Sequence, residues 1–138
     1  MAQNAVLAAV QQSCGKRVMT RPRTPRITGK HWLVEFYGAH DLSDVKAIRR
    51  AMKNAVTEAG VTLLKLQLHH FGPGDGVTGV ALLAESHISI HTWPERDYAA
   101  VDIFMCGKTS RPEKALAALR AALGPRKVRV RRFERGIS

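Results

Sequence analysis

The feature that most constrains this chain is a pair of strand-like segments that flank a glycine-rich turn. Residues 61–71 (VTLLKLQLHHF) and 77–84 (VTGVALLA) are rich in the branched apolar residues that favour strands. The sequence between them, GPGDG, contains the glycine and proline that interrupt strands and favour turns. We therefore expect the chain to leave one strand, turn, and return as the next strand.

Strand-like segments recur on both sides of this pair. The others lie at 31–38, 87–93, 98–107 and 127–133. The last of them alternates polar and apolar residues, as a half-exposed strand does. Because no turn signal precedes the segment at 87–93, we expect Glu85-Ser86 to lie at a kink or at a junction between strands.

Two segments have the apolar spacing of amphipathic helices. The first is expected to begin with Ser43 as its N-cap and to end at Gly60. The second is expected to begin at Pro112 and to end at Gly124. The order strand, helix, several strands, helix, strand predicts an α/β fold: a two-layer α/β sandwich, with a mostly antiparallel sheet and two helices on one face.

The length and the charge distribution indicate one folded domain with a basic extension. A chain of 138 residues suits one domain with one core. The formal net charge is +11, but residues 1–30 carry +6, residues 124–138 carry +5, and the stretch between them is neutral. We interpret residues 1–28 as a basic, disordered N-terminal tail with a short helix near Ala5–Gln12, and residues 29–138 as the folded domain.

The chain carries no recognisable signal for a membrane or for secretion. No apolar run is long enough to span a membrane, and the N-terminus lacks a cleavable leader. The two cysteines, Cys14 and Cys106, do not make a disulfide framework, which fits a reducing compartment. We therefore expect a soluble, cytoplasmic protein with no membrane partner.

A basic chain of this kind raises the alternative of a nucleic-acid-binding module. Sheets covered by two helices do bind RNA, but no strand here has the paired aromatic residues that such sheets use for stacking. A charged flank is more often a solvated tail than a binding arm. Nucleic-acid binding stays as the alternative from another class, restricted to the basic ends of the chain.

The most unusual stretch is 82–95, LLAESHISIHTWPE, in which polar residues interrupt a run that otherwise resembles a buried strand. Polar groups in such a strand need partners or a task. A metal site is not predicted, because His87 and His91 share a face but lack an evident third ligand, and no HExxH or paired CxxC motif occurs. A serine-hydrolase triad is equally unsupported, because Ser86 lacks the GxSxG elbow.

A self-processing serine fits this stretch better. A serine hydroxyl can attack the carbonyl of the residue before it, which converts the peptide bond into an ester. Removal of the serine α-proton then eliminates the preceding chain and leaves a dehydroalanine, which hydrolyses to a pyruvoyl group. Glu85-Ser86 supplies the junction that this chemistry needs, and His91 is a candidate proton acceptor.

Several separated pieces of the chain resemble one family in the same order. HWLVEFYG, then GVTGVALLAESHISIHTWPE, then YAAVDIFMCG are similar to the short bacterial and archaeal S-adenosylmethionine decarboxylase proenzymes, over about residues 31–135. The resemblance implies cleavage between Glu85 and Ser86, which gives a β chain of residues 1–85 and an α chain of residues 86–138. Ser86 would become a pyruvoyl group that forms a Schiff base with the substrate amine and accepts the electron pair released on decarboxylation.

The same resemblance implies roles for further residues. His91 would accept the α-proton during processing, and Cys106 would donate a proton to the substrate after carbon dioxide leaves. The implied reaction converts S-adenosylmethionine to decarboxylated S-adenosylmethionine, an aminopropyl donor for spermidine biosynthesis, without a metal. The implied substrate-binding residues are Glu95 for the ribose, Phe71 and Trp93 for the adenine, and Glu35 and Ser89 near the site.

The sequence leaves the assembly and the substrate open. Ser86 and His91 are five residues apart, so an ideal strand places them on opposite faces. Either the strand bends or the site draws on more than one chain, and the resemblance implies a homodimer with shared sites. Met105 and the GPGDG turn depart from the commonest family pattern, so a pyruvoyl-dependent ornithine or arginine decarboxylase of the same family stays the leading alternative.

Overall fold

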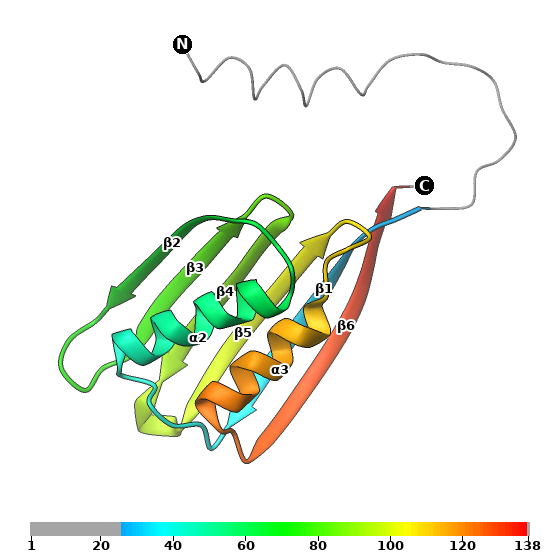
Figure 1. The fold of residues 1–138 in the computed structure, drawn as a ribbon. Helices are drawn as coiled ribbons and strands as arrows, with labels where there is room; N and C mark the ends of the chain where they lie inside the picture. Colours follow the sequence, from blue (N-terminus) through cyan, green and yellow to red (C-terminus); the bar gives the residue numbers. More distant parts are fainter. Residues whose placement is uncertain (1–25, 138) are drawn as a thin grey trace, which may run out of the picture.

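The computed structural model describes residues 26–137, which form a layer of strands and a layer of helices (Figure 1). The strands are β1 (Arg26–Tyr37), β2 (Leu63–His70), β3 (Val77–Leu83), β4 (Ser86–Trp93), β5 (Tyr98–Cys106) and β6 (Lys127–Ile137). The helices are α2 (Val45–Glu58) and α3 (Pro112–Leu123), and a 3-10 turn, η1 (Pro94–Arg96), joins β4 to β5. Neither α2 nor α3 is long and apolar enough to cross a membrane.

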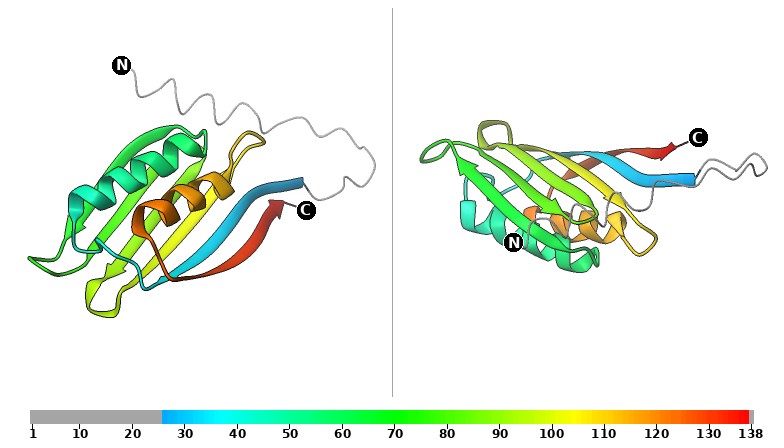
Figure 2. Two further views of the ribbon diagram at one scale, coloured as in Figure 1. Left: turned by 60° about the horizontal axis from the view of Figure 1, so that its bottom comes forward. Right: turned by 90° about the horizontal axis from the view of Figure 1, so that it is seen from above.

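The strands form one sheet in the order β2-β3-β4-β5-β1-β6, and every neighbouring pair in it is antiparallel. The helices α2 and α3 lie side by side on one face of this sheet (Figure 2). No described residue covers the opposite face, which we call the open face. The two-layer α/β sandwich predicted from the sequence is therefore confirmed.

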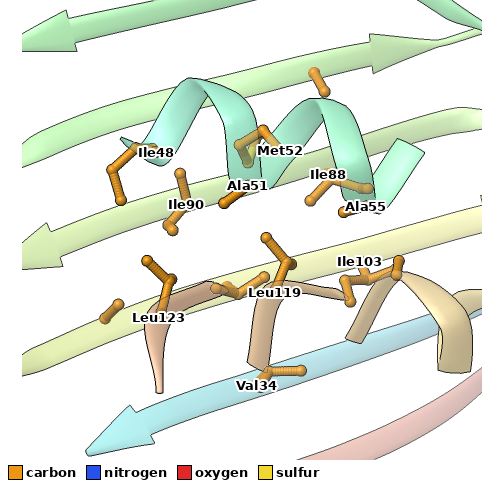
Figure 3. Close-up of a cluster of buried hydrophobic side chains, with 14 of the residues drawn as sticks. Val34, Ile48, Ala51, Met52, Ala55, Ile88, Ile90, Ile103, Leu119 and Leu123 are labelled. Carbon is orange, nitrogen blue, oxygen red and sulfur yellow. The ribbon is translucent and has the colours of Figure 1, made fainter. Parts of the chain in front are cut away.

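The hydrophobic core lies between the sheet and the two helices, so alternate residues of each strand face the core and the others face the open face. Ile88 and Ile90 of β4 are fully buried and alternate with more exposed residues. Together with Ile103 of β5 they face Met52 of α2 and Leu119 of α3 (Figure 3). Burial of each such side chain contributes about 1.5–3 kcal/mol, so this alternation is strongly fixed. His87, Ser89 and His91, which alternate with the buried residues, consequently point away from the helices. Thr92 is the exception among the polar residues, since it is buried on the helix side.

The first helix is capped one residue later than the sequence indicated. The N-cap of α2 is Asp44, whose Oδ1 accepts hydrogen bonds from the backbone N–H groups of Lys46 (2.9 Å) and Ala47 (3.0 Å). The bond from Ala47 is the main reason that the pKa of Asp44 lies below its usual value. The prediction of Ser43 as the cap was therefore wrong. Gly60, at φ 66°, follows the C-terminus of the helix as predicted.

The first and last strands of the chain, β1 and β6, are longer than expected. β1 begins at Arg26 rather than at His31, and Arg26 pairs with Ile137 at the far end of β6. Most of the basic residues expected in the C-terminal flank therefore lie in an edge strand, where positive charge discourages further strands from adding to the sheet. Residues 1–25, with the helix expected near Ala5–Gln12, lie outside the described residues.

Candidate active site

The Glu85–Ser86 bond lies at the tip of a tight hairpin. β3 ends at Leu83, a two-residue turn of Ala84 and Glu85 follows, and Ser86 pairs back across to Leu83. The expected junction between strands is thus a reversal of the chain rather than a kink. Ser86 has φ 144°, a backbone conformation that residues with a side chain rarely adopt. Backbone strain of this kind is concentrated at functional sites.

The residue before the strained serine is held from two directions. The Glu85 carboxylate accepts hydrogen bonds from the backbone N–H of Thr62 (2.9 Å) and from the Thr62 hydroxyl (3.2 Å). The Glu85 carbonyl accepts a hydrogen bond of 2.9 Å from the backbone N–H of Cys106 on β5. A fixed N–H donor on a carbonyl stabilises the negative charge that develops there when a nucleophile attacks. The geometry therefore suits attack on the Glu85 carbonyl.

The Cys106 side chain lies close to this bond, on the open face. Its neighbour Met105 is buried against the helices, so alternation along β5 directs the partly exposed Cys106 to the opposite side. Gly29 of β1 is directly opposite Cys106. A Cβ atom at Gly29 would lie 3.1 Å from Cys106 Sγ and 2.7 Å from the Phe104 ring. The missing side chain at Gly29 therefore makes the room in which thiol and ring sit.

A group of imidazole and aromatic rings lies on the open face next to Ser86. Ser86 Oγ lies 3.3 Å from His87 Nδ1. The His87 ring packs edge-on against Phe104, with centroids 5.9 Å apart, and edge-on against His31, with centroids 6.4 Å apart. These ring contacts limit the orientations that His87 can take.

His31 is itself fixed by charged partners on both sides. Its Nε2 lies 2.6 Å from Asp102 Oδ1, and its Nδ1 lies 3.2 Å from Arg135 Nη1. Since a guanidinium can only donate, Nδ1 is the acceptor and Nε2 carries the proton that is donated to Asp102. Arg135 also lies over the Phe104 ring, 5.5 Å from its centroid. This array ties the C-terminal part of β6 to the serine end of β4.

The other end of β4 borders a cavity of about 480 Å³. The wall residues that matter here are Phe71, Thr78, His91, Trp93 and Glu95. Three of the predicted substrate-binding residues are thus brought together with His91. His91 is hydrogen-bonded through Nδ1 to the Thr78 hydroxyl, and its ring centroid lies 6.4 Å from that of Trp93. Phe71 is 64% exposed, so one wall of the cavity is open to solvent.

Glu35 and Ser89 occupy the middle of the open face. They line a smaller cavity of about 200 Å³ that also touches His91. The Glu35 carboxylate accepts a hydrogen bond from the Tyr98 hydroxyl, and the Tyr98 ring stacks on Trp93 with centroids 5.2 Å apart. Burial, followed by the bond to Glu35, raises the pKa of Tyr98 to about 12. Tyr98 consequently stays a protonated donor at neutral pH.

One chain does not bring Ser86 and His91 together. β4 pairs without a register shift with β3 from Ser86 to His91 and with β5 from Ser86 to Trp93, so the strand does not bend between Ser86 and His91. Five residues of strand span about 16 Å. Cys106 lies at the Ser86 end, whereas Phe71 and Glu95 lie at the His91 end. Of the two explanations left open by the sequence, a bent strand is excluded.

Several residues of the site were not singled out from the sequence. Thr62 contacts Glu85 across a long sequence separation, and no local pattern indicates that contact. Gly29 lay at the expected boundary of the domain. Thr78 is directly opposite His91 in the β3–β4 hairpin, so counting back from the hairpin tip would have identified it. Within residues 26–137, no group of three or more His, Cys, Asp or Glu side chains is placed to hold a metal ion.

Comparisons with known proteins agree on one family. The family described as S-adenosylmethionine decarboxylase matches residues 30–136. An S-adenosylmethionine decarboxylase proenzyme of Thermomicrobium roseum is 42% identical over 79% of this chain and 94% of its own length, and one of Parasynechococcus marenigrum is 50% identical over 79% and 86%. The crystal structure of the adenosylmethionine decarboxylase from Aquifex aeolicus superposes with a TM-score of 0.76 at 38% identity, over 82% of this chain and 94% of that one.

Proposed function

This chain belongs to the S-adenosylmethionine decarboxylase family, and on that premise we propose that it cuts itself between Glu85 and Ser86 and then decarboxylates S-adenosylmethionine. The observation that carries the proposal is the geometry of that one bond. Ser86 has a strained φ of 144°, and the Glu85 carbonyl accepts a hydrogen bond of 2.9 Å from Cys106 N–H. The residues around the bond thus fit the formation of a pyruvoyl group from Ser86.

Processing begins with attack of Ser86 Oγ on the Glu85 carbonyl carbon. The Cys106 N–H donates to the carbonyl oxygen as it becomes negative, and the peptide C–N bond then breaks to leave an ester. His91 next removes the α-proton of Ser86, and the Glu85 carboxylate formed by this elimination leaves with the β chain, residues 1–85. Water then hydrolyses the remaining dehydroalanine and releases its nitrogen as ammonia, which gives an α chain, residues 86–138, whose first residue is the pyruvoyl group.

In the decarboxylation itself, the pyruvoyl group supplies an electron sink for the pair released as carbon dioxide leaves. Cys106 then donates a proton to the α-carbon of the substrate from the open face. The space above Gly29 allows the thiol and the Phe104 ring to lie beside each other at this position. The product would be decarboxylated S-adenosylmethionine, an aminopropyl donor for spermidine biosynthesis.

The cavity at the other end of β4 supports an adenosyl substrate. Phe71 and Trp93 offer exposed aromatic faces for the adenine, with exposed fractions of 64% and 38%. The Glu95 carboxylate in the same cavity suits the paired hydroxyls of a ribose, because an ionised carboxylate accepts two hydrogen bonds. Glu35 and Ser89 would contribute from the neighbouring cavity.

We further propose a homodimer in which each complete site combines two chains. Ser86 and Cys106 of one protomer would meet the partner's His91 and its substrate cavity. The separation of about 16 Å along β4 within one chain supports this arrangement. The open face also exposes large apolar side chains, as surfaces that bind a partner do. These side chains are Tyr37, Val80, Leu82, Trp93 and Phe133.

Intact mass spectrometry of the purified protein tests the processing. We expect two chains, 1–85 and 86–138, the second with a pyruvoyl group at its start, and we expect Ser86→Ala to stay uncut. A single full-length mass for the wild-type protein after long incubation would refute the pyruvoyl assignment.

Release of carbon dioxide tests the substrate. Cleaved protein should decarboxylate S-adenosylmethionine, in line with the names of its relatives. Release from ornithine or arginine alone would replace the proposed substrate by the alternative and leave the processing chemistry intact.

A further inference from the structure

The first step of the proposed processing needs a proton acceptor that His91 does not supply within the chain. Before Ser86 Oγ can attack, its hydroxyl proton has to go to a base within hydrogen-bond reach. His91 is about 16 Å away along β4 and has the α-proton of the second step as its proposed task. The structure places a different imidazole at the serine.

We propose that His87 is the catalytic base that activates the Ser86 hydroxyl, an inference that rests on the self-processing proposed above. His87 Nδ1 lies 3.3 Å from Ser86 Oγ. Catalytic hydrogen bonds are often this long before the reacting groups close on each other. The edge-on contacts of His87 with Phe104 and His31 hold the imidazole beside the serine.

The proton transfer balances within the chain. Neutral His87 takes the hydroxyl proton at Nδ1 while Ser86 Oγ forms its bond to the Glu85 carbonyl carbon. The oxyanion that results is stabilised by Cys106 N–H, which already donates to that oxygen at 2.9 Å. The protonated imidazole then returns the proton to the Ser86 nitrogen as the C–N bond breaks. The ester forms, and His87 is neutral again.

If His87 and His91 have separate tasks, loss of either one should stop self-processing at a different step. Loss of His91 blocks elimination after the ester has formed, so the ester accumulates. Loss of His87 slows formation of the ester, so the chain stays an ordinary peptide. Hydroxylamine distinguishes these states, because it cleaves an ester at neutral pH and leaves a peptide bond intact.

The decisive comparison is between His91→Ala and the double variant His87→Ala/His91→Ala. We expect hydroxylamine to split His91→Ala at Glu85–Ser86, with a hydroxamate on Glu85 detected by mass spectrometry. The double variant should split at least about tenfold more slowly, since general bases contribute about 10²–10⁴-fold to such steps. Added imidazole should restore part of the rate in the double variant.

A matched control removes a different histidine from the same background. His40 is exposed on the loop after β1 and lies outside the site, so His40→Ala/His91→Ala should split as fast as His91→Ala alone. Thermal unfolding checks that each variant is folded, and His87→Gln, which is closer in size, replaces His87→Ala if the alanine variant does not unfold cooperatively.

Equal splitting of the double variant and His91→Ala would overturn the role of His87. Self-cleavage of His87→Ala, which keeps His91, at the wild-type rate would overturn it as well. If wild-type protein never cleaved at Glu85–Ser86, the proposed function itself would fall. If wild-type protein is cleaved and the His87 variant is cleaved at the same rate, only the role of His87 is refuted and the proposed function stands.

Discussion

The two ends of β4 are built from different kinds of interaction. At the Ser86 end the bond to be cut is constrained: Ser86 has a positive φ, the Glu85 carbonyl is held by Cys106 N–H, and the Glu85 side-chain carboxylate is held by Thr62. At the His91 end side chains enclose a cavity over a regular strand. Breaking a peptide bond requires control of that bond, whereas binding a ligand requires space and side-chain chemistry.

Because the two ends of β4 differ in this way, we expect substitutions at each end to affect a different property of the protein. Changes at the Ser86 end should alter the cutting of the chain or the chemical step, and changes at the cavity should alter substrate affinity. Proton removal by His91 is the proposed exception, because it links the cavity end of one chain to the serine end of its partner. A cavity variant that stops cutting, or a variant at the Ser86 end that changes only substrate affinity, would contradict this division.

The largest effect is expected at Cys106, whose backbone and side chain have separate tasks. Cys106→Ala keeps the N–H on the Glu85 carbonyl, so the chain should still cut itself. Decarboxylation should fall by about 10²–10⁴-fold, because the proton donor is gone. Cleavage followed by mass spectrometry and carbon dioxide release measure the two properties. Loss of cleavage together with turnover would show that the thiol itself is needed for cutting.

A smaller effect is expected at the cavity end from Glu95→Gln. Loss of the charged acceptor should raise KM for S-adenosylmethionine by about tenfold, as expected for hydrogen bonds to a charged group. Self-cleavage should keep its wild-type rate, and Glu113→Gln on α3 serves as the matched control. An unchanged KM would remove Glu95 from the substrate site.

Gly29→Ala tests the room around the thiol. The new Cβ would lie 2.7 Å from the Phe104 ring and 3.1 Å from Cys106 Sγ, so both must shift. We expect a loss of about 1–3 kcal/mol in the free energy of unfolding, measured by urea denaturation, and slower decarboxylation. The adjacent exposed Lys30→Ala should leave both unchanged. Wild-type stability and turnover in Gly29→Ala would show that the ring and the thiol have space to spare.

The smallest effect concerns Tyr98 beside the cavity. Because its pKa is raised to about 12 from an ordinary 10.0, the folded state favours the protonated phenol. The associated stability is fully present below about pH 10 and is lost as pH rises through about 12. In Tyr98→Phe we expect stability no longer to fall between about pH 10 and pH 12 through this group. The part of the tyrosinate absorbance titration near pH 12 should disappear in the same variant. A wild-type titration complete near pH 10 would contradict the assignment.

The sequence anticipated most of the fold, because strand and helix order follows from local apolar periodicity. The sequence also singled out Ser86, His91 and Cys106 through motifs, and the reacting roles assigned to them stay predictions. It did not reveal the hairpin at Glu85, because the unusual backbone angle falls on a serine rather than on the glycine or asparagine that announces such turns.

Contacts between distant segments were equally hidden. The Thr62–Glu85 and His31–Asp102 bonds depend on which strands become neighbours, and that is decided by the whole sheet. The separation of Ser86 from His91 was visible from strand geometry alone, but only the regular pairing of β4 excluded a bend.

The claim that one chain carries two incomplete sites is tested most directly by complementation between two inactive chains. Ser86→Ala and His91→Ala, with different affinity tags, are expressed together, and pairs that carry both tags are purified. We expect the His91→Ala chain in these pairs to be cut and to gain a pyruvoyl group, because the partner's His91 reaches its serine, while the Ser86→Ala chain stays whole. Mixed pairs in which neither chain is cut would contradict a shared site.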